Sequence, residues 1–337
     1  MHFLETVPTV VGTAAVAPAL LVLWLVIATD ERPAPPLMVW AAFLLGAASI
    51  SLLGIARAPF ALFIAAAGDP WPALALHSIF AIAAPEEIVK VAVIVLVAAW
   101  RKPLADPMDA VIYGAAAGLG FAAYENLVYL ARYPEMWQSL ALIRSILTVP
   151  FHGALGIIAG AYLAISRAGL ALGAHRRERS WARVRLALSV ILVPIMLHAS
   201  FDLPLLALQM HPEFDGSGSV VLEAAAMLIG FGTIAFAARL VWRVGAHHAP
   251  RTELARVRLR HLRGMWALLV GGGGAGFAGF AFVLSSLRRW WIVTDAHATA
   301  SFAPAGIASI AIGTVLLVMT AAVYVQGRNR LLASGGG

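Results

Sequence analysis

The sequence predicts an all-α membrane protein, a polytopic bundle of transmembrane helices without a soluble domain. Of its 337 residues, 61% are hydrophobic and only 12% are charged, and the mean hydropathy is +0.86. A soluble globular domain carries about 25% charged residues, roughly twice this fraction. The apolar residues fall in long stretches, and a helix of about 20 such residues crosses a bilayer. We therefore predict a single integral membrane domain over residues 1–337. The composition is rich in alanine and arginine, which is typical of a GC-rich bacterial genome, so we expect the membrane to be a bacterial plasma membrane.

About nine stretches are long enough to be spans, and arginines set their direction. The basic residues concentrate in alternate connecting segments, chiefly 167–185 and 239–263. Because cytoplasmic segments carry the excess of arginine and lysine, the N-terminus is predicted outside and the C-terminus inside. The outside segments hold only Arg57, Arg132, Arg144, Arg288 and Arg289. The predicted spans are 7–29, 37–57, 74–100, 108–131, 140–166, 184–210, 219–243, 264–287 and 304–326.

Charge and cysteine content exclude several classes of protein. A net charge of +7 and a pI near 10.3 would be compatible with nucleic-acid binding. The basic residues instead follow the predicted loops, so we expect them to contact membrane lipid and predict no nucleic-acid partner. The chain has no cysteine, which excludes both a disulfide framework and a thiolate nucleophile.

Four consecutive spans carry ionisable or polar side chains near their middle. An ionisable group there costs at least about 2.5 kcal/mol on insertion scales, so it usually faces a partner or a water-filled cavity. We predict one shared site in a catalytic core of about 74–210, with accessory spans in 1–73 and 211–337. The side chains, span by span, are Glu86, Glu87 and Lys90; Glu125 and Asn126; His152; and His198 and Asp202.

The third span presents two adjacent carboxylates, Glu86 and Glu87, followed by Lys90 one turn later. On a helix, Lys90 can reach either carboxylate. Two neighbouring carboxylates resist being ionised together, and the lysine lowers this cost. One carboxylate can then stay paired while the other serves as a general base. The alternative is a buried ion triad that only locks helix packing.

The other three spans offer histidines with possible orienting groups. Glu125 could orient a histidine or a water, or make an ordinary interhelical hydrogen bond. His152 precedes a run of small residues that lets a neighbouring helix approach closely. His198 and Asp202 lie four residues apart on one helix face, as in many oriented imidazoles. Prolines stand shortly before three of these groups and predict kinks that widen the site; they are Pro85, Pro150 and Pro194.

The four clusters resemble the motifs of PrsW-type intramembrane proteases, a family related to the CAAX prenyl endopeptidases. The matching patterns are Glu-Glu-x-x-Lys at 86–90, Phe-x-x-x-Glu-Asn at 121–126, His-x-x-x-Gly at 152–156 and His-x-x-x-Asp at 198–202. The resemblance implies hydrolysis of a peptide bond in a membrane-anchored protein, such as an anti-sigma factor cut on its outer side.

The resemblance also implies residue roles. Glu86 would activate the attacking water, and His152 would share that water or protonate the leaving amine. His198, oriented by Asp202, would stabilise the oxyanion. Glu125 stands where the CAAX enzymes have a histidine. The implied catalytic residues are Glu86, Glu87, Glu125, His152 and His198, and the supporting residues are Lys90, Asn126 and Asp202.

Zinc and two non-proteolytic functions are the alternatives. His152, His198 and a carboxylate could bind zinc, but no His-Glu-x-x-His motif is present, so we predict a glutamate mechanism without a cofactor. A scaffold or immunity-type member of the same superfamily is a further alternative. The intact motifs argue against it, because a protein without catalytic activity could lose Glu86 or a histidine freely. A proton-coupled carrier would also need midplane carboxylates, and a flux assay would identify it.

Overall fold

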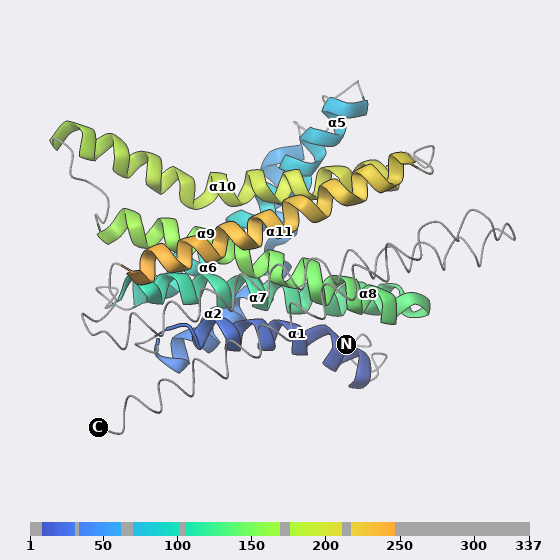
Figure 1. Cartoon of the computed structure of the whole chain (residues 1–337), viewed down its shortest axis with the longest axis horizontal. Helices are drawn as coiled ribbons and strands as arrows, with labels where there is room; N and C mark the ends of the chain where they lie inside the picture. The colour runs from blue at the N-terminus through green and yellow to red at the C-terminus, as the bar shows by residue number, and fades with distance from the viewer. Residues whose placement is uncertain are drawn as a thin grey trace, which may run out of the picture. The chain divides into compact units, whose positions relative to one another are not determined.

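The computed structural model describes residues 9–30, 34–61, 70–100, 106–168, 176–210 and 217–246. All regular elements in these ranges are helices, as the sequence predicts, and they belong to a compact unit formed by Met1–His248 (Figure 1). The predicted spans 264–287 and 304–326 lie outside the described residues. The main helices are α1 (Thr9–Ile27), α2 (Pro36–Ala48), α3 (Leu53–Arg57), α5 (Pro70–Leu76), α6 (Ala84–Trp100), α7 (Pro107–Arg132), α8 (Trp137–Ile143), α9 (Val149–Ala168), α10 (Arg176–Met210) and α11 (Ser217–Ala246).

Four helical stretches among the described residues are long and apolar enough to cross a membrane. They coincide with the second, fifth, sixth and seventh predicted spans, as expected for an integral membrane protein. The third and fourth predicted spans also lie on helices, α6 and α7, whose polar side chains lower their apolar character. The count of nine spans and the direction of the chain stay predictions. The four stretches are Pro36–Phe60, Pro134–Arg167, Val184–Met210 and Gly218–Gly245.

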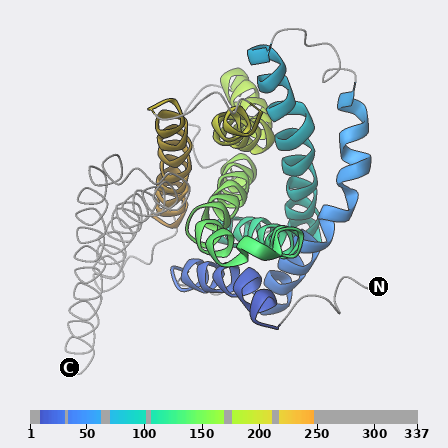
Figure 2. The same cartoon turned by 90° about the vertical axis from the view of Figure 1, so that its right-hand side faces the viewer.

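Helix α7 lies at the centre of the bundle and is almost wholly buried from Met108 to Ala123. The Asp106 carboxylate accepts a hydrogen bond from the Met108 amide at 2.9 Å, and Pro107 occupies the first turn, so the helix begins sharply. Helices α1 and α2 pack on one side of α7 and α9 packs on the other. Figure 2 shows α9 between α7, α10 and α11, which all contact it. This arrangement brings the polar spans together.

Facing glycines set the separation of α7 and α9. A Cβ atom on Gly114 would overlap the backbone carbonyl of Gly156, and one on Gly156 would overlap that of Gly114. A Cβ atom on Gly118 would likewise meet the carbonyl oxygen of His152. The close approach predicted for the His152 span therefore occurs, and it depends on backbone-to-backbone contact that only glycine permits.

We expect Gly156→Ala to lower stability by about 1–3 kcal/mol, the usual cost of overpacking, because neither backbone can yield to the added methyl group. The matched control is Gly232→Ala in α11, where the methyl group would meet nothing within 4 Å. Alanine there should be neutral or slightly stabilising. Thermal unfolding in detergent would compare the two variants. Equal midpoints would contradict the close packing of α7 and α9.

Two π-helical segments interrupt the spans that carry Glu86 and His152. The segment η3 (His77–Ala83) joins α5 to α6 just before Pro85, and η5 (Arg144–Thr148) joins α8 to α9 just before Pro150. A proline leaves the carbonyl four residues earlier without its helical partner, and π segments occur often at functional sites. The η3 segment is tied to α10 because Ser78 Oγ donates to the Ala199 carbonyl at 2.7 Å, next to His198.

Candidate active site

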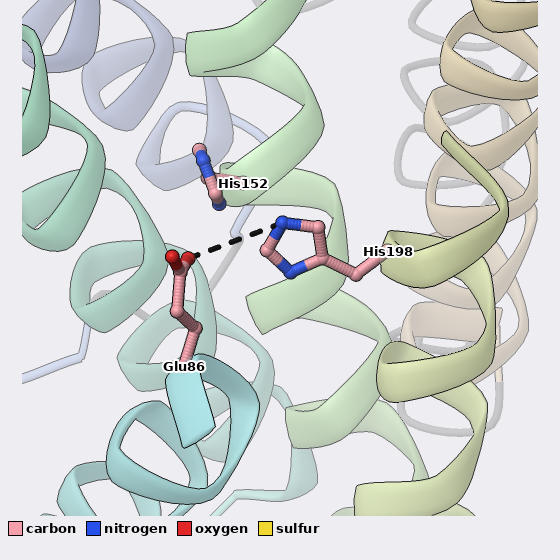
Figure 3. A group of neighbouring side chains, drawn as sticks. All are labelled: Glu86, His152 and His198. Atoms are coloured by element: carbon pink, nitrogen blue, oxygen red, sulfur yellow. Dashed lines mark ion pairs between the residues drawn. The ribbon is translucent and has the colours of Figure 1, made fainter. Parts of the chain in front are cut away.

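The polar side chains of α6, α7, α9 and α10 meet in one buried cluster. Figure 3 shows Glu86, His152 and His198 pointing toward one another from three different helices. The Glu86 Oε2 atom lies 3.9 Å from His198 Nε2, and the two imidazole centroids are 5.2 Å apart. Three residues that are far apart in the chain thus face a common point.

Lys90 stands at the centre of this cluster and is 0% exposed. Its Nζ atom donates to Glu87 Oε1 at 2.6 Å and lies 3.7 Å from Glu86 Oε2. It also lies 3.0 Å from His152 Nδ1, and 4.3 Å from the centroid of the Phe121 ring. The lysine therefore links both carboxylates of α6 with the histidine of α9.

The contacts of His152 define its proton arrangement. An ammonium group only donates hydrogen bonds, so His152 Nδ1 accepts from Lys90. The proton of the neutral ring then resides on Nε2, which lies 3.0 Å from Glu125 Oε2. Glu125 is thus placed to orient this histidine, and both ring nitrogens are engaged.

His198 is surrounded by three carboxylates. Its Nδ1 atom lies 2.7 Å from Glu87 Oε1, while its Nε2 atom lies 3.3 Å from Asp202 Oδ2 and faces Glu86. The sequence suggests Asp202 as the orienting group, but the structure adds Glu87 on the opposite ring nitrogen. Since Glu87 and His198 are 111 positions apart, spacing along the chain gives no sign of this bond.

The cluster is least covered at two of its side chains. The side chains of Glu125 and Asp202 are 19% and 17% exposed, whereas those of Glu86, Glu87, Lys90, His152 and His198 are 7% or less. Glu125 and Asp202 are therefore the members of the site that come nearest to its surroundings.

Comparison with known proteins gives the family of this chain. Residues 34–247 match a family described as PrsW family intramembrane metalloprotease, and this range contains all four polar clusters. The chain belongs to the PrsW family. It is therefore an intramembrane protease by family, and the resemblance read from the motifs is confirmed.

Several bacterial proteins named Protease PrsW are similar to this chain. The Bacillus subtilis (strain 168) protein is 36% identical over 100 residues, 30% of this chain and 40% of that protein. The Geobacillus kaustophilus protein is 27% identical over 215 residues, 64% of this chain and 88% of the relative. The Oceanobacillus iheyensis protein is 26% identical over 190 residues, which is 56% of this chain and 80% of the relative. No solved structure matches this PrsW-family chain.

The family description includes metalloprotease, so the site must be tested for residues that could bind a metal ion. Glu86, His152 and His198 each offer one ligand atom, and these atoms lie within 4.8 Å of one another. Glu86 Oε2 is buried and has no hydrogen-bond partner in the described part of the chain. One carboxylate and two imidazoles fit a divalent cation such as zinc. Such binding would require His152 to release Lys90 or Glu125.

Sequence reasoning missed one residue of the PrsW-family site, Arg144. The basic-residue pattern places it in an outer segment, but the side chain is buried and contacts Glu125 and Asn126. The position of Arg144 inside the predicted span 140–166 was a usable signal, because a charged residue within a span rarely lacks a partner.

Proposed function

We propose that this PrsW-family protein hydrolyses a peptide bond in a membrane-anchored protein, such as an anti-sigma factor, and that Glu86 activates the attacking water. One observation carries the proposal: Glu86 Oε2 is buried, lacks a hydrogen-bond partner in the described residues, and faces His198 Nε2 at 3.9 Å. A buried oxygen of this kind calls for a partner. A water bonded to both atoms would supply it and would stand where a carbonyl carbon can be attacked.

The proposed reaction uses Glu86 as both base and acid. As the water oxygen bonds to the carbonyl carbon, Glu86 takes one water proton. His198, held by Glu87 and Asp202, donates its Nε2–H to the developing oxyanion. When the carbon–nitrogen bond breaks, Glu86 returns the proton to the leaving amine, which yields a carboxylic acid and an amine. His152 borders the water and keeps its orientation through Lys90 and Glu125.

A zinc-dependent version of the same hydrolase is the second candidate, favoured by the donor set of Glu86, His152 and His198. A cation bound there would polarise the water and the scissile carbonyl. The residues surrounding the site would still orient the histidines and exclude solvent.

The proposed arrangement in the membrane follows the sequence prediction. It has nine spans, an N-terminus outside, and a catalytic core of 74–210 within one domain. The packing of α1, α2 and α11 around α7 and α9 supports accessory roles for the outer helices. We propose that substrate enters beside Glu125 and Asp202, the least covered side chains of the site.

Cleavage by purified protein tests this function. The full chain in liposomes should cut at least one member of a panel of single-span membrane proteins, and mass spectrometry should place the cut within or beside the span. His198→Ala should cut none at a comparable rate. Proteolysis that survives this substitution unchanged, or absence of cleavage across the panel, would contradict the proposal.

A chelator arm in the same assay separates the two candidates. For the glutamate mechanism we expect cleavage to continue unchanged after exhaustive chelation. Loss of cleavage that zinc restores would instead assign Glu86, His152 and His198 as metal ligands.

A further inference from the structure

We propose that Arg144 is a positioning residue of the active site, which holds His152 in its working orientation through Glu125. This inference rests on the proposed function, because it assigns a task within the same reaction. Arg144 lies outside the four motifs, and it does not touch Glu86 or the place of the attacking water.

The guanidinium of Arg144 binds two neighbouring side chains of α7. Its Nη2 atom donates to Glu125 Oε2 at 2.7 Å, and its Nε atom donates to Asn126 Oδ1 at 2.6 Å. The residue is only 8% exposed. Because the guanidinium is planar and presents its donors at fixed angles, two bonds to adjacent residues fix the position of the Glu125 carboxylate.

The same carboxylate oxygen reaches the histidine. Glu125 Oε2 accepts from Arg144 and lies 3.0 Å from His152 Nε2, while Lys90 engages Nδ1 on the other side of the ring. The imidazole is thus held between a carboxylate and an ammonium, which selects the tautomer with its proton on Nε2. Without Arg144, Glu125 would lose the cation opposite it and the fixed position of its oxygen.

The surroundings of Arg144 keep it in place. The side chain begins at the first residue of the π segment η5, and the Tyr129 ring centroid lies 4.1 Å from the guanidinium carbon. Asn126 Nδ2 donates in turn to the Ala15 carbonyl of α1 at 3.4 Å. Arg144 therefore connects the outer helix α1 and the central helix α7 to the histidine helix α9.

A double-mutant cycle tests whether Arg144 acts through Glu125. We expect Arg144→Gln and Glu125→Gln each to lower kcat about 10–100-fold, the factor known for groups that orient histidines in metal sites. The value of KM should change little. The double variant should be no worse than the poorer single variant, because the two residues act in one chain of contacts. Effects that multiply in the double variant would overturn the proposal.

Two further variants separate this role from helix packing. Arg132→Gln removes an exposed arginine near the same end of α7 and should leave kcat unchanged. Arg144→Lys keeps the positive charge beside Glu125 and should recover part of the kcat lost in Arg144→Gln. A kcat in Arg144→Gln equal to that of Arg132→Gln would contradict the proposal. The double variant Arg144→Gln/Glu125→Gln removes both members of the ion pair, so it leaves neither charge buried without its partner. Its kcat can therefore be measured even if one of the single variants unfolds.

A spectroscopic measurement is independent of cleavage. With 15N-labelled histidine, NMR of the full chain in lipid should show a protonated Nε2 on His152, assigned with a His152→Asn variant. We expect Arg144→Gln to shift this resonance and Arg132→Gln to leave it in place. An unshifted resonance would overturn the positioning role of Arg144, even if no substrate is cut. A shifted resonance without cleavage would support the positioning role and contradict only the proposed function.

Discussion

Glu86→Gln is expected to reduce peptide hydrolysis by at least about 10³-fold while the protein stays folded. General acid–base catalysis contributes about 10²–10⁴-fold in enzymes, and Glu86 is assigned both transfers. Glutamine has nearly the same shape but cannot take a proton from water. The buried Oε2 atom makes no hydrogen bond in the described residues. Lys90, which faces it at 3.7 Å, keeps its shorter bond to Glu87 at 2.6 Å, so the ion pair of the lysine survives the substitution.

The measurement is single-turnover cleavage of one membrane-anchored substrate in liposomes, with thermal unfolding followed on the same samples. Glu135→Gln is the matched control, since Glu135 is exposed in the short turn after α7. We expect it to cleave at the wild-type rate. More than a tenth of wild-type activity in Glu86→Gln would remove this residue as the base and direct attention to Glu87 or Glu125.

Lys90→Met is expected to have the largest effect on stability. The lysine is fully buried and donates to Glu87, whose side chain is 1% exposed. Removing one partner of a buried ion pair typically costs about 3–5 kcal/mol, because the other charge is left without compensation. Methionine matches the length of the side chain, so lost packing adds little. Cleavage should also be lost, because His152 and Glu87 would no longer share a donor.

The control for Lys90→Met is the double variant Lys90→Met/Glu87→Gln. Glutamine at position 87 removes the carboxylate that Lys90 bonds at 2.6 Å, so part of the lost stability should return, while cleavage should stay absent. The free energy of unfolding from detergent titration would compare the variants. A double variant no more stable than Lys90→Met would show that the lysine stabilises the fold through contacts other than Glu87.

Much of the fold and of the site could be predicted from local features of the chain. Helical membrane spans follow from runs of apolar residues, because the bilayer requires every backbone polar group to be bonded within its own helix. Burying an ionisable group at mid-membrane costs free energy, and this cost identified four candidate residues before any contact was known. They are Glu86, Glu125, His152 and His198. The order of these groups along the chain was sufficient to identify the PrsW family.

Tertiary structure alone decided how the groups are paired. The bonds of Glu87 to His198 and of Arg144 to Glu125 join different helices, and helical spacing constrains only neighbours three or four residues apart on one helix. The π segments before Glu86 and His152 turn these residues relative to the preceding helix, and the glycine contacts of α7 and α9 set how near their side chains approach. Which polar groups lie in the membrane is a property of composition, whereas which of them meet depends on helix rotation and separation, and packing sets both.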